Sequence, residues 1–406
     1  STLFPYTTLF RSRLYQRYPQ LRQTSNIFLF YGKQIEKDKS ILYTNPQIKY
    51  IKSDSFEKLR LRSLIAIGNP IVDISSNIEE DVIDKFGLKW GETVFANKSN
   101  VGFFKELEKN KNVKYIPGGS IQNTLRTCAW CLGMEPGRDK TFTITMLGAT
   151  GKDSYRNKII DALHFAGVKD LLECIPDKET SRCGVGICKK ERCLLPEIRA
   201  SNMINVDFII DNLKKIDDHD ALLLEGYFIQ ERYEICRDLC KRFKQKRKTV
   251  ILTLSAVFMV QTYYDKFIEL ANYSDLIIAN KAELEELAKE KDKENKDLFI
   301  KISKKLVKKK RLFIVTDDKK GVIVAKYDYK RGTMDFILRG FPKPVKSEDI
   351  VDLNGAGDAF LGGFLSQYML GKSFEACCKA GNDVAGIIIK NIGCTFPKNF
   401  KINFAD

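Results

Sequence analysis

From Ser63 onward, short apolar runs alternate with longer stretches in which apolar residues recur at helical spacing. Runs rich in Leu, Ile and Val are typical of buried strands. We expect strands at 64–67, 141–147, 221–224, 249–254, 276–279, 312–316 and 322–325. We expect helices at 153–166, 230–243, 281–289, 298–309, 359–370 and 374–389. This alternation predicts an α/β fold with a central, mostly parallel sheet flanked by helices.

Two stretches interrupt the alternation. Residues 72–115 are mixed in character, and residues 180–196 show strand-like alternation with interspersed charges. We expect lid segments at about 72–117 and 180–199 to form a small β-rich layer that covers a site. The polar motifs discussed below follow the predicted strands, where ligands bind in open α/β sheets.

The beginning of the chain does not share this pattern. Residues 2–12 resemble the conceptual translation of a short-read sequencing adapter, and the first methionine is Met134. Residues 13–62 are basic and weakly patterned, and a natural extension, a targeting segment and translated leader sequence are all open. Their several acidic residues disfavour a transit peptide. We expect residues 1–62 to be a disordered or artefactual extension and residues 63–400 to be the folded domain.

Composition narrows the class of protein. Of the 406 residues, 44% are hydrophobic, which is enough for a sizeable core, and no apolar run approaches the roughly twenty residues that cross a bilayer. Eleven cysteines are scattered along the chain, which is typical of free thiols in a reducing compartment, so we expect a cytoplasmic protein without a membrane partner. Cys128 and Cys131 form a C-x-x-C inside a helical pattern, and packing explains them better than a zinc or redox site.

A formal net charge of +16 raises the question of nucleic-acid binding. Much of the basic charge lies in residues 241–248 and 281–311, each of which contains a single aromatic residue. That is too few for a base-stacking platform, so we expect a solvated lysine-rich surface and no nucleic-acid partner. The two histidines, His164 and His219, leave little room for a His-rich zinc site or a His-dependent triad.

Residues 352–358 read Asp-Leu-Asn-Gly-Ala-Gly-Asp and lead directly into the predicted helix 359–370. Glycines let the backbone approach an anion, and the start of a helix presents unpaired N–H groups to it. Asp358 then lies where a base would accept a proton from an attacking hydroxyl. The pattern suggests phosphoryl transfer to an alcohol, although a tight turn with a helix N-cap would produce the same local sequence.

Five further sequence motifs favour phosphoryl transfer over a simple turn with a helix N-cap. They are Gly68-Asn69-Pro70-Ile71-Val72-Asp73-Ile74-Ser75, Gly118-Gly119-Ser120-Ile121-Gln122-Asn123, Leu252-Thr253-Leu254-Ser255-Ala256, Asn280-Lys281-Ala282-Glu283 and Gly393-Cys394-Thr395-Phe396-Pro397. With residues 352–367, the chain resembles the PfkB or ribokinase-like family of carbohydrate and nucleoside kinases, and within it the branch that phosphorylates adenosine. The resemblance implies a ribokinase-like fold, ATP and Mg²⁺ as cofactors, adenosine as the acceptor, and a monomer.

The resemblance also implies catalytic roles. Asp358 would be the base, and the amides of Gly355, Ala356 and Gly357 would form the anion hole for the moving phosphoryl group. Arg192 resembles a lid arginine that approaches that group, and a planar cation suits its charge. A surface charge on a hairpin remains an equal alternative for Arg192.

For the nucleoside, the resemblance implies a set of hydroxyl-binding and apolar residues. A carboxylate can accept from two vicinal hydroxyls, which suits Asp73, although a turn residue is the alternative there. The implied substrate-binding residues are Asn69, Asp73, Gly118, Gly119, Ser120 and Asn123, with Phe95, Cys183 and Phe228 as apolar contacts for the base.

For the nucleotide, the resemblance implies contacts from Asn280, Glu283, Thr316, Asp352 and Asn354. Asn280 and Glu283 would contact Mg²⁺, most naturally through water because magnesium keeps its hydration shell. The alternative is a helix N-cap with a capping box, which is compatible with ligand binding.

The chain departs from the family pattern at three places. Leu353 replaces a threonine, Asp317-Asp318 stands where a glycine is common, and Glu225 replaces a small residue before Gly226. These changes leave the donor preference open and do not remove the base. Another nucleoside or sugar kinase is the alternative within the family, and a non-catalytic nucleoside- or nucleic-acid-binding protein is the alternative outside it.

Overall fold

The computed structural model describes residues 60–135, 141–188, 191–307, 310–328, 333–340 and 342–397. Within them the larger sheet has nine strands in the order β13-β12-β11-β10-β9-β8-β1-β4-β5. The seven strands from β5 to β11 in this order are parallel, and β12 and β13 continue the sheet antiparallel. The strands are β1 Ser63–Ile67, β4 Thr143–Gly151, β5 Lys169–Ile175, β8 Ala221–Leu224, β9 Thr249–Thr253, β10 Leu276–Asn280, β11 Arg311–Thr316, β12 Val322–Asp328 and β13 Thr333–Gly340.

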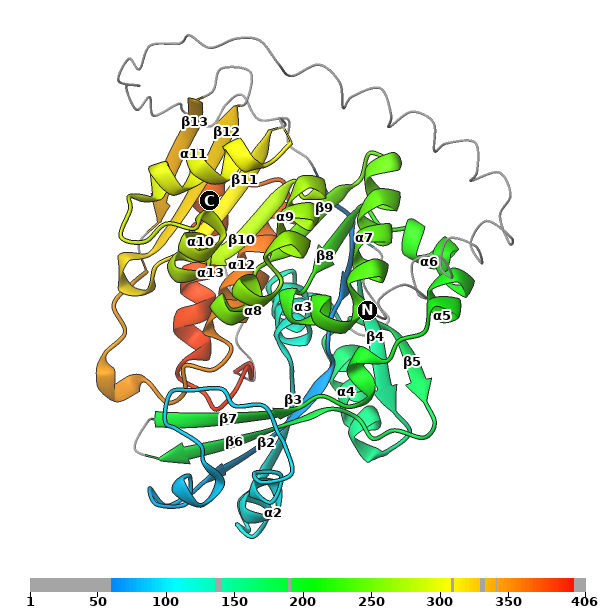
Figure 1. Cartoon of the computed structure of the whole chain (residues 1–406), viewed down its shortest axis with the longest axis vertical. Coiled ribbons are helices and arrows are strands. Elements are labelled where there is room, and N and C mark those ends of the chain that lie inside the picture. The colour runs from blue at the N-terminus through cyan, green and yellow to red at the C-terminus, as the bar shows by residue number, and fades with distance from the viewer. Residues whose placement is uncertain are drawn as a thin grey trace.

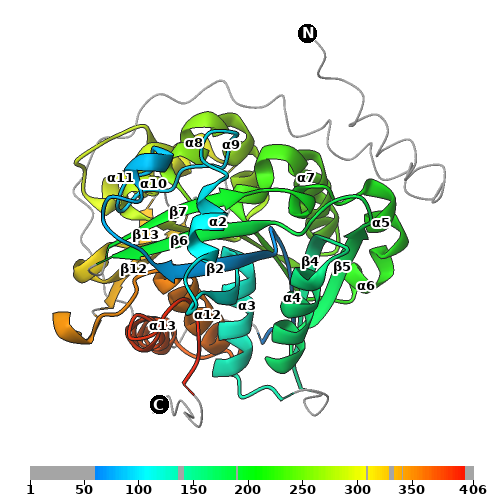
Figure 2. The same cartoon turned by 90° about the horizontal axis from the view of Figure 1, so that it is seen from below.

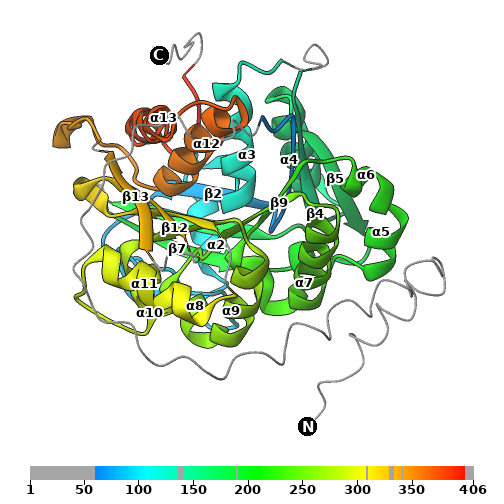
Figure 3. The same cartoon turned by 90° about the horizontal axis from the view of Figure 1, so that it is seen from above.

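Helices cover both faces of this sheet, as the two views turned from Figure 1 show (Figures 2 and 3). One face carries α3 Ser120–Cys131, α4 Ser154–Phe165, α12 Ala356–Met369 and α13 Phe374–Ile388. The other carries α5 Val206–Asp211, α6 Leu213–Asp217, α7 Ile229–Gln245, α8 Val257–Thr262, α9 Tyr264–Tyr273, α10 Lys281–Ala288 and α11 Asn295–Lys305. Two large apolar cores result, one on each side of the sheet, because parallel strands bury both of their faces.

A second sheet of four strands, in the order β3-β2-β6-β7, lies across the carboxyl end of the first (Figure 1). It comprises β2 Ile71–Asn77, β3 Lys114–Gly118, β6 Arg182–Cys188 and β7 Glu191–Glu197, with α2 Phe103–Glu108 on its outer side. Phe103, Phe104 and Leu107 of α2 form a small core of their own with the sheet. This layer is the predicted β-rich lid, and the ribokinase-like α/β architecture predicted from the sequence is confirmed.

The strand order indicates where a ligand is expected to bind. The chain runs from β1 through the second sheet to β4 on one side, and later to β8 on the other, so β1 lies at a switch point. In open α/β sheets the crevice at the carboxyl ends of such strands binds ligands. Gly68, Asn69 and Pro70 leave β1 there, and Glu225 leaves β8 there.

Most predicted elements are present with ends shifted by a few residues. The elements β5, β13, α2, α5, α6, α8 and α9 were not predicted, and α3 was noted only as a helical pattern around Cys128. β5 reads Lys-Asp-Leu-Leu-Glu-Cys-Ile and is mostly half-buried, since it lies at the sheet edge and lacks a continuous apolar run. Residues 1–59 and Lys308–Lys309 lie outside the described residues. In the described part of the chain, no helix is both long enough and apolar enough to cross a membrane.

Candidate active site

The glycine-rich loop ends at the first turn of α12, beneath the smaller sheet. Gly355 is the residue before the helix and has φ 77°, a left-handed conformation that favours glycine. An added Cβ there would also lie only 3.1 Å from Cβ of Cys394. Gly357 is exposed, and a Cβ on it would meet nothing within 4 Å. The amide of Ala356 donates to the carbonyl of Leu353 at 3.3 Å. The start of a helix carries unpaired N–H groups, and the exposed Gly357 leaves room there for an anion.

Two side chains of α3 hold the carboxylate of Asp358. Ser120 Oγ donates to Oδ1 at 2.7 Å, and Asn123 Nδ2 donates to Oδ2 at 3.0 Å. Burial raises the pKa of Asp358, while these two hydrogen bonds lower it. Asp358 as a whole residue is half-buried. The structure thus brings Asp358, Ser120 and Asn123 together from positions more than 230 residues apart.

Asp73 lies on β2 next to the glycines that end β3. It is 8% exposed, and burial, together with the charges of Asp352 and Asp358, raises its pKa to about 7. A Cβ on Gly118 would lie 2.3 Å from the Asp73 carboxyl group, so only glycine fits. Gly119 has φ 90°, and a Cβ on it would lie 2.5 Å from the carbonyl oxygen of Asn69.

Two buried amide oxygens at this place lack partners. Within the described residues, Oδ1 of Asn69 and Oδ1 of Asn123 accept no hydrogen bond although both atoms are buried. Leaving such atoms unpaired costs free energy, so they point to a ligand that donates hydrogen bonds. Sugar hydroxyls have that property.

Arg192 reaches the loop from β7 of the smaller sheet. Its Nη1 donates to Oδ1 of Asp352 at 3.0 Å. Asp352 is 6% exposed and also accepts from the amides of Asn354, at 2.8 Å, and Gly393, at 2.8 Å. A guanidinium group is therefore held beside the glycine-rich loop by a carboxylate that also shapes that loop.

Asn280 and Glu283 form a capping box at the start of α10. Both carboxylate oxygens of Glu283 accept from Asn280, at 2.8 and 3.0 Å, and burial raises the pKa of Glu283 to about 7. Among the described residues, no group of three or more His, Cys, Asp or Glu side chains gathers as a metal cluster. The residues do not fit a direct metal-ligand set, and a water-mediated role for this pair remains a prediction. Thr316 ends β11 directly beside Asn280.

Comparison with known proteins assigns the family. A model of the pfkB family of carbohydrate kinases matches residues 84–400. The chain belongs to the pfkB family of carbohydrate kinases. The adenosine kinase of Dictyostelium discoideum is 31% identical to it over 343 residues, which is 82% of this chain and 96% of that protein. Adenosine kinase 2 of Arabidopsis thaliana is 29% identical over 349 residues, or 84% of this chain and 97% of that protein.

Solved structures of adenosine kinases have a fold similar to that of this chain. Adenosine kinase of Anopheles gambiae, in complex with a diadenosine tetraphosphate, superposes with a TM-score of 0.74 at 28% identity, covering 83% of this chain and 98% of that one. Adenosine kinase of Trypanosoma brucei brucei, in its apo form, gives a TM-score of 0.73 at 26% identity, covering 82% and 100%.

Apolar residues predicted for the base pocket of this pfkB-family chain have different environments. Phe95 is 40% exposed and meets Phe258 of α8 edge-to-face at 6.0 Å, which links the smaller sheet to the larger domain. Cys183 is buried opposite Asp73 in the β2–β6 pair. Phe228 is 1% exposed and lies in the main core. Base contacts by these three residues therefore remain predictions.

Three residues at the site were not predicted from the sequence to act there. Half-buried Tyr227 lies near Glu283, Glu225 and Asp358, whose charges add to burial in raising its pKa. Arg126 of α3 is 7% exposed and donates to the carbonyl of Pro117 at 2.9 Å and to that of Cys394 at 3.4 Å. Glu225 is 1% exposed. The available signal was a charge inside an apolar context, which marks Arg126 and Glu225 as needing buried partners.

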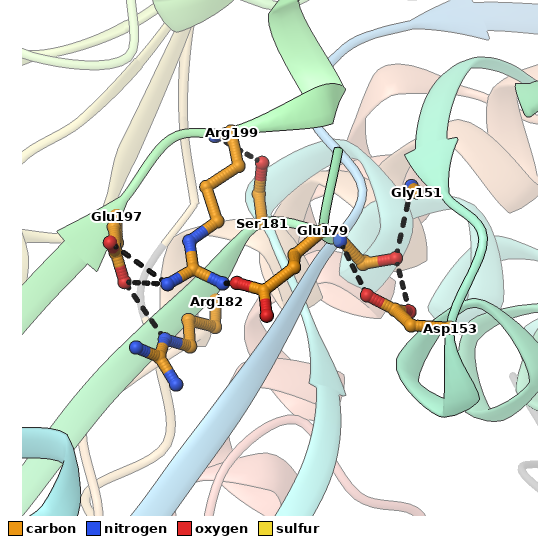
Figure 4. Close-up of polar contacts among 8 residues, drawn as sticks. Gly151, Asp153, Glu179, Ser181, Arg182, Glu197 and Arg199 are labelled. Carbon is orange, nitrogen blue, oxygen red and sulfur yellow. Dashed lines mark hydrogen bonds and ion pairs between the residues drawn. The ribbon is translucent and has the colours of Figure 1, made fainter. Parts of the chain in front are cut away.

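Polar contacts brace the two chain crossings between the sheets (Figure 4). Thr180 donates from its backbone N–H and from Oγ1 to Asp153, each at 2.7 Å. Arg199 pairs with Glu197 at 3.0 Å and also with Glu179. The segments entering β6 and leaving β7 are thereby tied together at the base of the smaller sheet.

The thiols, the histidine and the basic run that composition marked for other chemistries make packing contacts and ion pairs in the described residues. Cys128 and Cys131 are free thiols on α3, and burial raises the pKa of both. His219 Nε2 lies 2.8 Å from Oγ1 of buried Thr145, and burial lowers its pKa, as expected for a packing role. In the basic run at the end of α7, Lys244 pairs with Asp275 at 2.7 Å.

Proposed function

We propose that this protein is an ATP-dependent adenosine kinase, which transfers the γ-phosphoryl group of ATP to the 5′-hydroxyl of adenosine and yields AMP and ADP. The observation that carries the proposal is the carboxylate of Asp358, held by Ser120 and Asn123 in the first turn of α12. The adenosine kinases named above, similar over more than four-fifths of the chain, support the choice of acceptor.

The residues suggest an in-line transfer without a covalent intermediate. Asp358 would accept the proton of the 5′-hydroxyl as the oxygen attacks phosphorus, with the first-turn amides of α12 stabilising charge on the phosphoryl oxygens. Arg192 would add positive charge from the smaller sheet. Such a mechanism depends on positioning and on exclusion of water, for which a covering sheet is suited.

For the nucleoside, the unpaired oxygens of Asn69 and Asn123 and the carboxylate of Asp73 would accept from ribose hydroxyls. Rejection of sugars without these hydroxyls follows, because buried acceptors would stay unpaired. Mg²⁺ enters the proposal only with the bound nucleotide, whose charge it would offset. A role in purine salvage, cytoplasmic localisation and a monomeric state remain predictions from the sequence.

An acceptor panel tests the proposal. ADP release is followed in a coupled assay with adenosine, inosine, ribose and fructose at equal concentrations. We expect kcat/KM for adenosine to exceed that for each free sugar by at least about 100-fold, since the free sugars lack the base and the apolar burial it would contribute. Preference for a free sugar would reassign the protein within the pfkB family. Absence of ADP release together with salt-dependent RNA binding would support the non-catalytic alternative.

A further inference from the structure

Glu225 is a buried acid at the place where β1, β8 and α3 meet. It follows the last residue of β8 and is 1% exposed. Its Oε2 accepts from the backbone N–H of Asn69 at 2.7 Å. The backbone of Ile121 lies near enough to its carboxyl group to lower its pKa, against the effect of burial. The neighbouring Gly68 makes room for it, since a Cβ there would lie 2.5 Å from the same oxygen.

Asn69 and Ile121 belong to the two segments that build the site. Asn69 lies in the crossover from β1 to the smaller sheet, and its unpaired Oδ1 is one of the predicted nucleoside contacts. Ile121 lies in the first turn of α3, whose preceding residue, Gly119, supplies no side-chain cap. The same turn begins with Ser120, which holds the Asp358 carboxylate. Glu225 therefore binds the first segment and lies beside the first turn of α3.

Glu225 is buried, so a bound ligand would feel it through these neighbours. Burial and the charge of Asp358 raise the pKa of Glu225 to about 8. The group is then largely uncharged at neutral pH and adds little repulsion beside the catalytic carboxylate and the incoming phosphates. A hydrogen-bonding side chain of the same size without a charge should retain part of its function.

We propose that Glu225 is a positioning residue that sets Asn69 for the nucleoside and the first turn of α3 for the catalytic carboxylate. This inference rests on the proposed kinase function. It assigns a role to a residue where the sequence departs from the family pattern. Loss of the acceptor should raise KM for adenosine through Asn69 and lower kcat through Asp358, while KM for ATP stays unchanged.

Variants matched in size test the proposal. Glu225→Leu fills the space but accepts no hydrogen bond, so the buried N–H of Asn69 loses its partner and the first turn of α3 loses a nearby acceptor. We expect KM for adenosine to rise about 10-fold or more and kcat to fall about 10-fold or more, because each tenfold effect needs only one such loss. Glu225→Gln keeps one acceptor oxygen and should lie between Glu225→Leu and the unmodified enzyme. Glu231→Ala, at an exposed glutamate in α7, is the control and should leave all constants unchanged.

A purely structural role predicts another result. It would lower the melting temperature and the active fraction, with KM for adenosine unchanged in the molecules that fold. Unchanged KM and kcat in folded Glu225→Leu would overturn the proposal. Should that variant not fold, Gly68→Ala displaces the carboxyl group instead, and wild-type constants there would overturn it equally. If the unmodified enzyme prefers another acceptor, the proposed acceptor changes. The KM and kcat of the variants, compared with those of the unmodified enzyme on that acceptor, still decide the role of Glu225.

Discussion

Replacing Asp358 with asparagine separates catalysis from binding at this site. The introduced amide would keep an oxygen that accepts from Ser120 Oγ, which lies 2.7 Å from the carboxylate in the unmodified protein. Its new NH₂ group would face Asn123, whose own Oδ1 is unpaired and can accept once the Asn123 amide turns over. Both hydrogen bonds can therefore be kept, and we expect the free energy of unfolding to change by less than about 1 kcal/mol.

The chemical step should respond far more strongly. Removing a positioned general base typically costs about 10²–10⁴ in rate, so we expect kcat for adenosine to fall by that factor in Asp358→Asn. Adenosine affinity, measured by calorimetry, should stay within about threefold. The contacts assigned to Asn69 and Asp73 are untouched, and the turned Asn123 amide offers its NH₂ group to a ribose hydroxyl, which can accept as well as donate. Turnover is followed as ADP release, with adenosine-free reactions subtracted.

A matched substitution checks that the loss is specific. Asp349 lies upstream on the same segment and makes an exposed ion pair with Lys390 at 3.1 Å. Asp349→Asn should change kcat by less than about twofold, since exposed pairs contribute little. Turnover of Asp358→Asn within tenfold of the unmodified enzyme would refute the base assignment, as would loss of adenosine binding in a folded variant.

Other contacts lead to four further predictions. Gly118→Ala would place a Cβ 2.3 Å from the Asp73 carboxyl group and should raise KM for adenosine about 10- to 100-fold. The control Gly386→Ala, where an added Cβ has its nearest contact at 3.6 Å, should leave KM unchanged. Equal KM values for the two variants in steady-state kinetics would contradict this prediction. Because burial raises the pKa of Asp73 to about 7, adenosine affinity measured by calorimetry should increase up to about tenfold from pH 6 to pH 8. Asp73→Asn should show no such pH dependence. An affinity independent of pH in the unmodified protein would contradict this prediction. The same carboxyl group loses its proton first in the unfolded chain, so its contribution to stability decreases as pH rises from 3.8 to about 7. Arg192→Ala removes the cation paired with Asp352 at 3.0 Å and should lower kcat about 10- to 100-fold without changing adenosine affinity, and an unchanged kcat would argue for a surface role.

Local patterns in the sequence were enough for much of the fold and part of the site. Continuous apolar runs predicted most of the parallel strands, because a strand buried on both faces has no polar side. The glycine before α12 and the Asn280–Glu283 pair were readable as helix starts, since capping and left-handed backbone depend on near neighbours. The order of the motifs along the chain was enough to recognise the family that comparison confirmed.

Tertiary packing decided what those patterns leave open. No local rule pairs Glu225 with Asn69, 156 residues away, or places Asp358 between Ser120 and Asn123. The sequence likewise could not show that Phe228 is buried in the core while Tyr227 lies near the catalytic acids. Near-neighbour rules describe backbone preference and burial period, whereas side-chain partners and shifted pKa values depend on which distant surfaces meet and how much water they exclude. The chemistry of this site therefore arises where the carboxyl ends of β1 and β8 meet the first turns of α3 and α12.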